Sequence, residues 1–336
     1  MAIVNIDIFD IIRVMKIKIN VLALDGVFDT GLAIVQDTFS TANELAEMSA
    51  LTPLRFDVAV VSVRRTVRTS HGLSVPVVAA AERTRPAWVV VPALGYKMPG
   101  PLQQALERPE LKDARAALCE WSRRGAGVAA ACVGTFVLAE TGLLDGHAAT
   151  TTWWLAPIFR QRYPRVLLDE SRMVVKSEKL VTAGAALSHI DMALSLIREV
   201  SPELAALTAK YLVIDKRPSQ SAYAISDQLI HSDPMVERFE RWARDRLSEG
   251  FSLDDAARTL ATSKRTLARR MREVLGKTPL SYFQDLRVEH AVHLLETTRD
   301  SIEQIATSVG YADGVTLRAL LRRRLGRGVR ELRVGS

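Results

Sequence analysis

The spacing of apolar residues changes near residue 218, and this change limits the chain to two unlike domains. Before that point, short apolar runs alternate with amphipathic stretches, and after Asp233-Pro234 only helical spacing remains. Strands that alternate with helices favour a parallel sheet covered on both faces, whereas a helix-only pattern predicts an all-α domain. The 336 residues also exceed what one ordinary core holds.

The first part has the pattern of an α/β domain. Its expected strands are Ile17–Leu24, Phe56–Ser62, Trp88–Val91, Gly127–Ala131, Met173–Lys176 and Leu180–Ala183. Amphipathic helical stretches fill the intervals, at Ala33–Met48, Leu111–Arg124, Thr135–Glu140, Trp153–Arg162 and Ile190–Glu199. We therefore predict a doubly wound, mostly parallel sheet over residues 15–217, after an N-terminal extension of residues 1–14.

The expected linker covers residues 218–233, and an all-α domain of residues 234–336 follows it. The linker starts with Pro218-Ser219-Gln220-Ser221, which has the composition of a loop. At its other end, Asp233 can cap a helix that has Pro234 as its first residue.

Composition excludes several classes of protein. No apolar run reaches eighteen residues, and the first residues lack a basic region, so the sequence predicts neither a spanning helix nor a signal peptide. The two cysteines, Cys119 and Cys132, are too few for a disulfide framework and have no metal-ligand spacing. We therefore expect a protein of the reducing cytoplasm with no metal or other cofactor and no membrane association.

Positive charge is concentrated in the second part of the chain. Residues 234–336 carry 20 Lys and Arg against 14 Asp and Glu, whereas residues 1–233 carry 25 against 24. A basic domain attached to a neutral one indicates a polyanionic partner, although a merely soluble, arginine-rich helical domain would have the same charge.

Two helix-turn-helix patterns occur in this basic part, at residues 252–275 and 301–324. Ser252 and Ser301 each begin a capping box, and Ser263 and Asp313 can cap the second helix of each unit. Such a second helix enters the major groove of DNA, where arginine matches the acceptors of guanine and other basic side chains hold phosphates. The exposed positions expected to contact DNA are Lys264, Arg265, Ala268, Arg269 and Arg272 in the first unit and Thr316, Arg318 and Arg322 in the second.

This part of the chain, over about residues 235–333, resembles the DNA-binding domain of the AraC/XylS regulators. The resemblance rests on six segments, Ser263–Met271, Gly276–Pro279, Leu286–Ala291, Leu294-Leu295, Ile305-Ala306 and Gly310–Asp313. The sequence departs from the family at Leu317 and Leu320, where phenylalanines are usual. Because Gly314 and Val315 offer no hydrogen bonds to bases, we expect the first unit to dominate sequence reading.

In the α/β part, Cys132 is the residue most suggestive of chemistry. It follows the apolar strand predicted at 127–131 and precedes a helix start, with small residues on either side. A nucleophile held at such an elbow is lifted clear of the sheet, at a helix start that activates thiols. A buried cysteine in an alanine-rich strand explains the same pattern, and the local sequence favours that second interpretation.

The α/β part, from about residue 16 to residue 220, resembles the PfpI-type branch of the class I glutamine amidotransferase-like superfamily. The matching segments are Ala131–Gly134, Leu138–Gly146, Ala149–Trp153 and Thr182–Gly184, with Asp191. The resemblance implies a flavodoxin-like fold, and the fusion of such a domain to an AraC-type reader is a familiar regulator architecture.

The resemblance also implies which residues border Cys132. The family commonly has a histidine where this chain has Thr152, and threonine cannot act as a base for a thiol at neutral pH. The acidic residue that contacts the cysteine in relatives would correspond to Asp37. His189 lies after Gly184 in a loop that could approach Cys132, so it is the candidate to replace the missing histidine as base.

These observations predict a sequence-specific DNA-binding transcriptional regulator whose amidotransferase-like domain is catalytically inactive and responds to a small-molecule effector. The pocket for the effector would be formed by Asp37, Cys132, Val133, Thr152 and His189. Double-stranded DNA is the expected partner, the resemblance implies a homodimer, and RNA polymerase is a further candidate partner. Two alternatives are a cysteine-dependent amidase or deglycase-type enzyme and a thiol redox sensor, each with a DNA-binding tail.

Overall fold

The structure is a computed structural model that describes residues 15–49, 53–215, 217, 219–220, 233–325 and 328–333. It divides into two compact units, one made of the residues up to Thr151 together with Val174–Arg217, the other of Thr152–Met173 together with the residues from Pro218 onward. Each unit is described by itself. The expected N-terminal extension and most of the expected linker lie outside the described residues.

A seven-stranded sheet forms the centre of the first unit, with the strand order β10-β11-β7-β6-β1-β2-β5. The strands are β1 (Met15–Leu22), β2 (Leu54–Ser62), β5 (Val78–Ala79), β6 (Trp88–Val91), β7 (Gly127–Ala131), β10 (Val174–Ser177) and β11 (Leu180–Ala183). All pairs are parallel except that of β10 with β11. The predicted fold class, a doubly wound and mostly parallel sheet, is confirmed.

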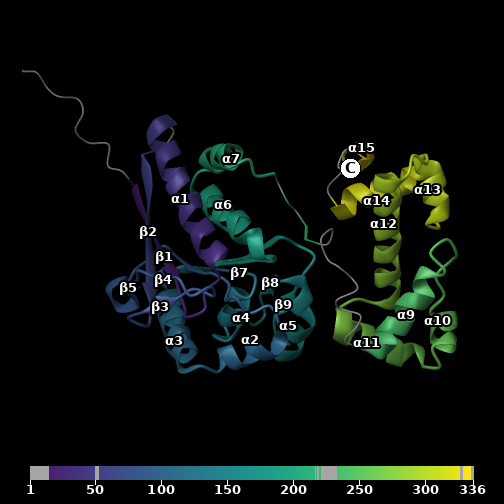
Figure 1. The fold of residues 1–336 in the computed structure, drawn as a ribbon, viewed down its shortest axis with the longest axis horizontal. Helices are drawn as coiled ribbons and strands as arrows, with labels where there is room; N and C mark the ends of the chain where they lie inside the picture. Colours follow the sequence, from purple (N-terminus) through teal and green to yellow (C-terminus); the bar gives the residue numbers. More distant parts are fainter. Residues whose placement is uncertain are drawn as a thin grey trace, which may run out of the picture. The chain divides into compact units, whose positions relative to one another are not determined.

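Helices cover both faces of this sheet (Figure 1). One face carries α1 (Asp29–Ser49), α6 (His189–Val200) and α7 (Pro202–Tyr211). The other carries α2 (Pro99–Leu106), α3 (Pro109–Arg123) and α4 (Gly134–Ala139). The core beneath α1 and α6 combines alternate residues of neighbouring strands, such as Val21, Val90 and Val181, with Phe39 of α1. This alternation is what a parallel sheet covered on both faces requires.

Several short elements complete the first unit. They are β3 (Val67–Arg68), β4 (Ser74–Val75), η1 (Ala80–Glu82), β8 (Ala148–Ala149) and η3 (Ala186–Ser188). The segment Thr152–Met173 of the second unit contains η2 (Trp153–Leu155), α5 (Ala156–Arg162) and β9 (Leu167–Leu168). The helix predicted over Trp153–Arg162 begins as the 3-10 turn η2 and continues as α5, which has a proline in its first turn. Proline is well suited to that position because it has no backbone N–H to satisfy.

In the described residues after 233, all the regular elements are helices. They are α9 (Pro234–Arg244), α10 (Leu253–Thr259), α11 (Lys264–Leu275), α12 (Pro279–Thr297), α13 (Ile302–Ser308), α14 (Gly314–Leu325) and α15 (Val329–Arg333). The predicted N-caps are present at Asp233, Ser252, Ser263 and Ser301, each of which accepts a backbone N–H. Ser301 also forms the full reciprocal capping box with Gln304. Both predicted helix-turn-helix units are therefore confirmed as pairs of helices.

Each helix-turn-helix unit has its own apolar core, and α12 contributes to both. Its first half supplies Tyr282, Phe283 and Leu286 to the core that contains Leu267 and Met271 of α11. Its second half supplies Val288, Ala291 and Leu295 to the core that contains Leu317 and Leu321 of α14. The two units are thus joined by one continuous helix rather than by a loop.

Two polar side chains of α12 hold these two cores together. Arg287 donates from Nε to the Leu247 carbonyl at 2.9 Å, and its guanidinium lies over the rings of Phe283 (4.8 Å) and Tyr311 (5.4 Å). Asp285 lies 2.9 Å from Nζ of Lys277 and 2.7 Å from Nη1 of Arg324. Both side chains therefore contact elements on each side of the joint.

Candidate functional site

The Cys132 elbow lies at the end of β7, at the carboxyl edge of the sheet. Its φ is +54°, in the left-handed region that residues other than glycine rarely adopt. Its N–H donates to the Ala183 carbonyl at 2.7 Å, and its side chain is only 3% exposed. The strained backbone agrees with an elbow, whereas the burial agrees equally with a packed core cysteine.

Gly134 brings this elbow against the end of β6. A Cβ atom at Gly134 would lie 2.4 Å from the carbonyl oxygen of Val91 and 2.8 Å from that of Pro92. Only glycine allows the backbone of α4 to approach so closely, because the neighbouring atoms belong to the backbone and cannot rotate away. Gly134, two residues after Cys132, is therefore packed directly against the backbone of residues 91 and 92.

Three consecutive threonines pass the same edge of the sheet, and all three are fully buried. The Thr150 N–H donates to Oγ1 of Thr182 at 2.8 Å, and the Thr151 hydroxyl donates to the Cys132 carbonyl at 2.8 Å. Thr152 is the next residue, and its Oγ1 has no hydrogen-bond partner within the described part of the chain. A buried hydroxyl without a partner is costly, so it marks a place where a ligand or water can bind.

His189 is fully buried, and the protein backbone engages both of its ring nitrogens. Nε2 accepts the N–H of Ala93 at 3.0 Å, and Nδ1 lies 2.6 Å from the carbonyl oxygen of Ala186. These partners require the neutral ring with its proton on Nδ1. Burial lowers the pKa of His189 to about 4, even though the bond to Ala186 opposes that shift. The ring therefore ties η3 to the end of β6, and neither nitrogen is available as the replacement base that the sequence suggested.

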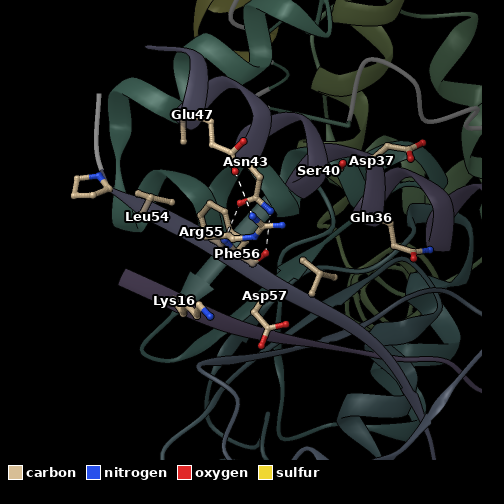
Figure 2. Close-up of a pocket in the computed structure, with 13 residues that line it drawn as sticks. Lys16, Gln36, Asp37, Ser40, Asn43, Glu47, Leu54, Arg55, Phe56 and Asp57 are labelled. Atoms are coloured by element: carbon tan, nitrogen blue, oxygen red, sulfur yellow. Dashed lines mark hydrogen bonds and ion pairs between the residues drawn. The ribbon is translucent and has the colours of Figure 1, made fainter. Parts of the chain in front are cut away.

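The structure places Asp37 away from this edge, on the exposed side of α1, which differs from its predicted position in the pocket. Asp37 instead lines an open cavity of about 1000 Å³ between α1 and β2, together with Lys16, Arg55 and Asp57 (Figure 2). At its floor, the Asn43 carboxamide bonds the Phe56 backbone at 2.8 and 2.9 Å. The predicted contact failed because helix periodicity turns residue 37 outward when Val35 and Phe39 face the core.

A carboxylate with several hydrogen-bond partners, Asp29, lies at the start of α1. Its Oδ2 accepts from the Ser70 hydroxyl at 2.8 Å and lies 2.8 Å from Nδ1 of His71. Burial would raise the pKa of Asp29, but side-chain hydrogen bonds from Thr69, His71 and Ser70 outweigh it and hold the pKa far below its usual range. The sequence did not single out this cluster because residues 69–71 approach Asp29 only through the fold.

In the first helix-turn-helix unit, α11 presents its basic residues outward. Leu267, Met271 and Leu275 are buried, whereas Lys264, Arg265, Arg269 and Arg272 are exposed and Ala268 is half-buried. Lys264 pairs with Asp254 at 2.8 Å, and Arg269 pairs with Glu273 at 2.7 Å. Among the described residues, the guanidinium groups of Arg265 and Arg272 have no ion-pair or hydrogen-bond partner. These two guanidinium groups are therefore the ones most available to an anionic partner.

The second unit differs in the chemistry of its outer face. Thr316, Arg318 and Arg322 are exposed, as predicted for residues that contact DNA. The Thr316 hydroxyl, however, bonds the capping residue Asp313 at 3.1 Å, and Arg318 lies 3.1 Å from Glu303. Polar groups in the first turns of α14 thus have partners within the protein.

The described part of the chain contains neither a cluster of metal-binding side chains nor a helix that could span a membrane. Nowhere in residues 15–49, 53–215 and 233–325 do three His, Cys, Asp or Glu side chains gather as a metal site would require. No helix within those same stretches is long and apolar enough to cross a lipid bilayer.

With this fold and these sites in view, the chain belongs to the DJ-1/PfpI family, whose family model matches residues 18–199. A model for a helix-turn-helix domain matches residues 256–334. The class of protein is therefore an AraC-type helix-turn-helix chain with an amino-terminal DJ-1/PfpI domain, and both resemblances proposed from the sequence are confirmed.

Curated relatives carry names of the same class. The HTH-type transcriptional regulator ArgR of Pseudomonas aeruginosa is 27% identical over 202 residues, which are 59% of this chain and 61% of that protein. The HTH-type transcriptional regulator GbdR of the same species is 26% identical over 194 residues, or 56% of this chain and 53% of that protein. The matches therefore span only a little over half of the relatives' own length.

Among solved structures, an AraC family transcriptional regulator from Pseudomonas putida matches with a TM-score of 0.49 and 19% identity, covering 58% of this chain and 99% of that one.

Proposed function

We propose that this chain is a sequence-specific DNA-binding transcriptional regulator, in which the DJ-1/PfpI domain binds a small effector and does not catalyse a reaction. The observation that carries the proposal is the outer face of α11, where exposed Arg265 and Arg272 have no partner among the described residues. Because isolated guanidinium groups on a rigid helix suit the paired acceptors of guanine and the oxygens of phosphate, this face fits the major groove. Lys264, Arg269 and Arg322 would add contacts to the DNA backbone.

The direct test is a gel-shift titration of the full chain against fragments of DNA from upstream of its own gene, at moderate salt. We expect a specific complex that competitor DNA of scrambled sequence does not displace. Replacing Arg265 with alanine should weaken this complex, whereas the matched change of exposed Arg123, on α3, should leave it intact. The proposal fails if the wild-type chain binds specific and scrambled fragments equally.

Two features support the proposal that the DJ-1/PfpI domain does not catalyse a reaction. Thr152 has no basic atom to take a proton from the Cys132 thiol, and both nitrogens of His189 are held by the backbone. The test is to compare wild type with the Cys132→Ser variant for amide turnover and for DNA binding. We expect no Cys132-dependent turnover and unchanged DNA binding. Turnover that vanishes in the variant would instead support a cysteine-dependent hydrolase.

We propose that Thr152 contributes to the effector site, because its buried hydroxyl has no hydrogen-bond partner among the described residues. A thermal-shift screen of small metabolites would identify stabilising compounds. Thr152→Val should abolish the shift, and Asp57→Ala, in the cavity of Figure 2, should not. The opposite pattern would move the effector site to that cavity.

A homodimer would place two copies of the basic domain on repeated half-sites at whole-turn spacings, as expected for a cytoplasmic regulator of this kind. Sedimentation of the full chain with and without DNA tests this expectation, and a single monomer on the complete site would contradict it. Contact with RNA polymerase remains a separate proposal, to be tested by co-purification on promoter DNA.

A further inference from the structure

The outer face of α14 is apolar where the outer face of α11 is cationic. Val315 lies in the first turn of α14 and is 69% exposed, the highest exposure of any large apolar side chain described between residues 233 and 325. Ala319, four residues later, is exposed on the same side of the helix. Leu317 and Leu321 of α14 face the core. Val315 is therefore not a core residue that the fold has left exposed.

A single exposed valine needs no explanation by itself. The groups around Val315, however, indicate what kind of partner it could contact. The polar groups beside it already have partners at the protein surface, because Thr316 bonds Asp313 and Arg318 pairs with Glu303. Farther along the helix, Arg322 and Arg323 are exposed, and within the described part of the chain neither guanidinium group has an ion-pair or hydrogen-bond partner. A helix with an apolar beginning and free cations toward its end can bind phosphates while it presents methyl groups to the floor of a groove.

In the major groove, the only apolar group on a base edge is the C5 methyl of thymine. We propose that α14 reads thymine through its methyl group, with Val315 and Ala319 as the residues that contact it. The two units would then recognise bases by different interactions. Helix α11 would donate hydrogen bonds from guanidinium groups to guanine, and α14 would make apolar contact with thymine. This inference rests on the proposed function, because it requires that the chain bind DNA.

The test begins with selection of binding sites from a randomised duplex pool by the full chain, by R265A and by V315N. We expect two blocks of preferred bases. R265A should lose a block that contains guanine, whereas V315N should change only the other block, which should contain thymine. Because position 315 is exposed, neither the fold nor the stability of the protein should depend on the valine there.

The decisive step replaces each thymine of that second block with deoxyuridine, which differs only by the missing methyl. Loss of one buried methyl should weaken wild-type binding about fourfold. The same replacement should have little effect on V315A, and replacement of thymines outside this block should have none. R265A should remain sensitive to deoxyuridine in the second block, which makes it the matched control.

The outcomes separate the two proposals. If the chain selects a guanine block but wild type binds deoxyuridine and thymine duplexes equally, the thymine inference is overturned and the regulator proposal stands. Equal binding would also point to a protein partner for Val315. If no preferred sequence emerges from any pool, the proposed function fails, and the inference fails with it. Should V315N not fold, the deoxyuridine experiment on wild type alone decides.

Discussion

The Nε2 atom of His189 lies 3.0 Å from the backbone nitrogen of Ala93, and it accepts the hydrogen bond of that N–H. This contact joins two segments at the carboxyl edge of the sheet that are far apart in the sequence. It also depends on charge, because a protonated ring has no lone pair with which to accept the Ala93 N–H. The packing of the edge is therefore coupled to the protonation state of one buried ring.

A pH dependence of stability follows from this coupling. Burial lowers the pKa of His189 to about 4 from its ordinary value of 6.5, so the unfolded chain binds the proton more readily than the folded one. The stabilising contribution is complete above pH 6.5 and is lost as the pH falls from 6.5 toward 4. Its full size is about 3 kcal/mol. Denaturant unfolding followed across this range measures it.

The variant His189→Gln provides the control for this prediction. Glutamine does not titrate, so the variant should be less stable at neutral pH but should lack the slope between pH 6.5 and 4. If wild type and variant had the same slope, other groups would be its cause.

A second prediction concerns Gly134. Its replacement by alanine places a methyl 2.4 Å from the Val91 carbonyl oxygen, and the backbone there must shift to accept it. We expect the free energy of unfolding to fall by about 1–3 kcal/mol, the usual cost of overpacking. Gly100→Ala is the matched control, because a Cβ at Gly100 meets nothing within 4 Å. Equal stability of the two variants would show that the end of β6 moves freely.

A third prediction concerns Arg287 at the joint between the two helix-turn-helix units. Arg287→Met keeps an apolar side chain over Phe283 but leaves the Leu247 carbonyl without its charged donor. We expect a loss of about 1.5–3 kcal/mol in stability of the helical part. DNA binding to a two-block site should weaken more than binding to either block alone. The exposed Arg299→Met variant should behave as wild type in both assays.

The fourth prediction separates reading of bases from binding of phosphates. Arg265→Ala should cost about 1–3 kcal/mol on specific DNA if its guanidinium pairs with guanine, and should cost much less on random DNA. Arg322→Gln should weaken both complexes alike and should reduce the slope of log K against log salt by about 1. Titrations at several salt concentrations measure both quantities. Identical behaviour of the two variants would contradict this division of roles.

Much of the fold could be predicted from the sequence, because local signals coincide with the elements. The strands β6, β7 and β11 have their predicted bounds, since each is a short apolar run between turn residues. The caps at Ser263 and Ser301 were predictable because side-chain capping depends on residues only three apart. The two-residue strands, such as β3 and β5, carry too few residues to form a pattern.

The candidate site in the DJ-1/PfpI domain was less predictable, because its contacts are not local. The bond from Ala93 to His189 joins residues 96 positions apart, and the contact of Ser70 with Asp29 spans 41 positions. Sequence spacing named His189 but could not show that the backbone holds both of its nitrogens. The family resemblance suggested that Asp37 lies beside Cys132, whereas the phase of α1 turns its side chain toward solvent.

The continuity of α12 has a consequence for the DNA that this chain can recognise. A single helix of 19 residues has side chains in both cores. It therefore fixes the distance between the two units, and neither unit can rotate about the duplex axis relative to the other. Five inserted base pairs, about half a turn of B-DNA, would carry the second block to the opposite side of the duplex, beyond the reach of α14. Natural binding sites should thus tolerate changes of base far better than changes in the distance between their two blocks.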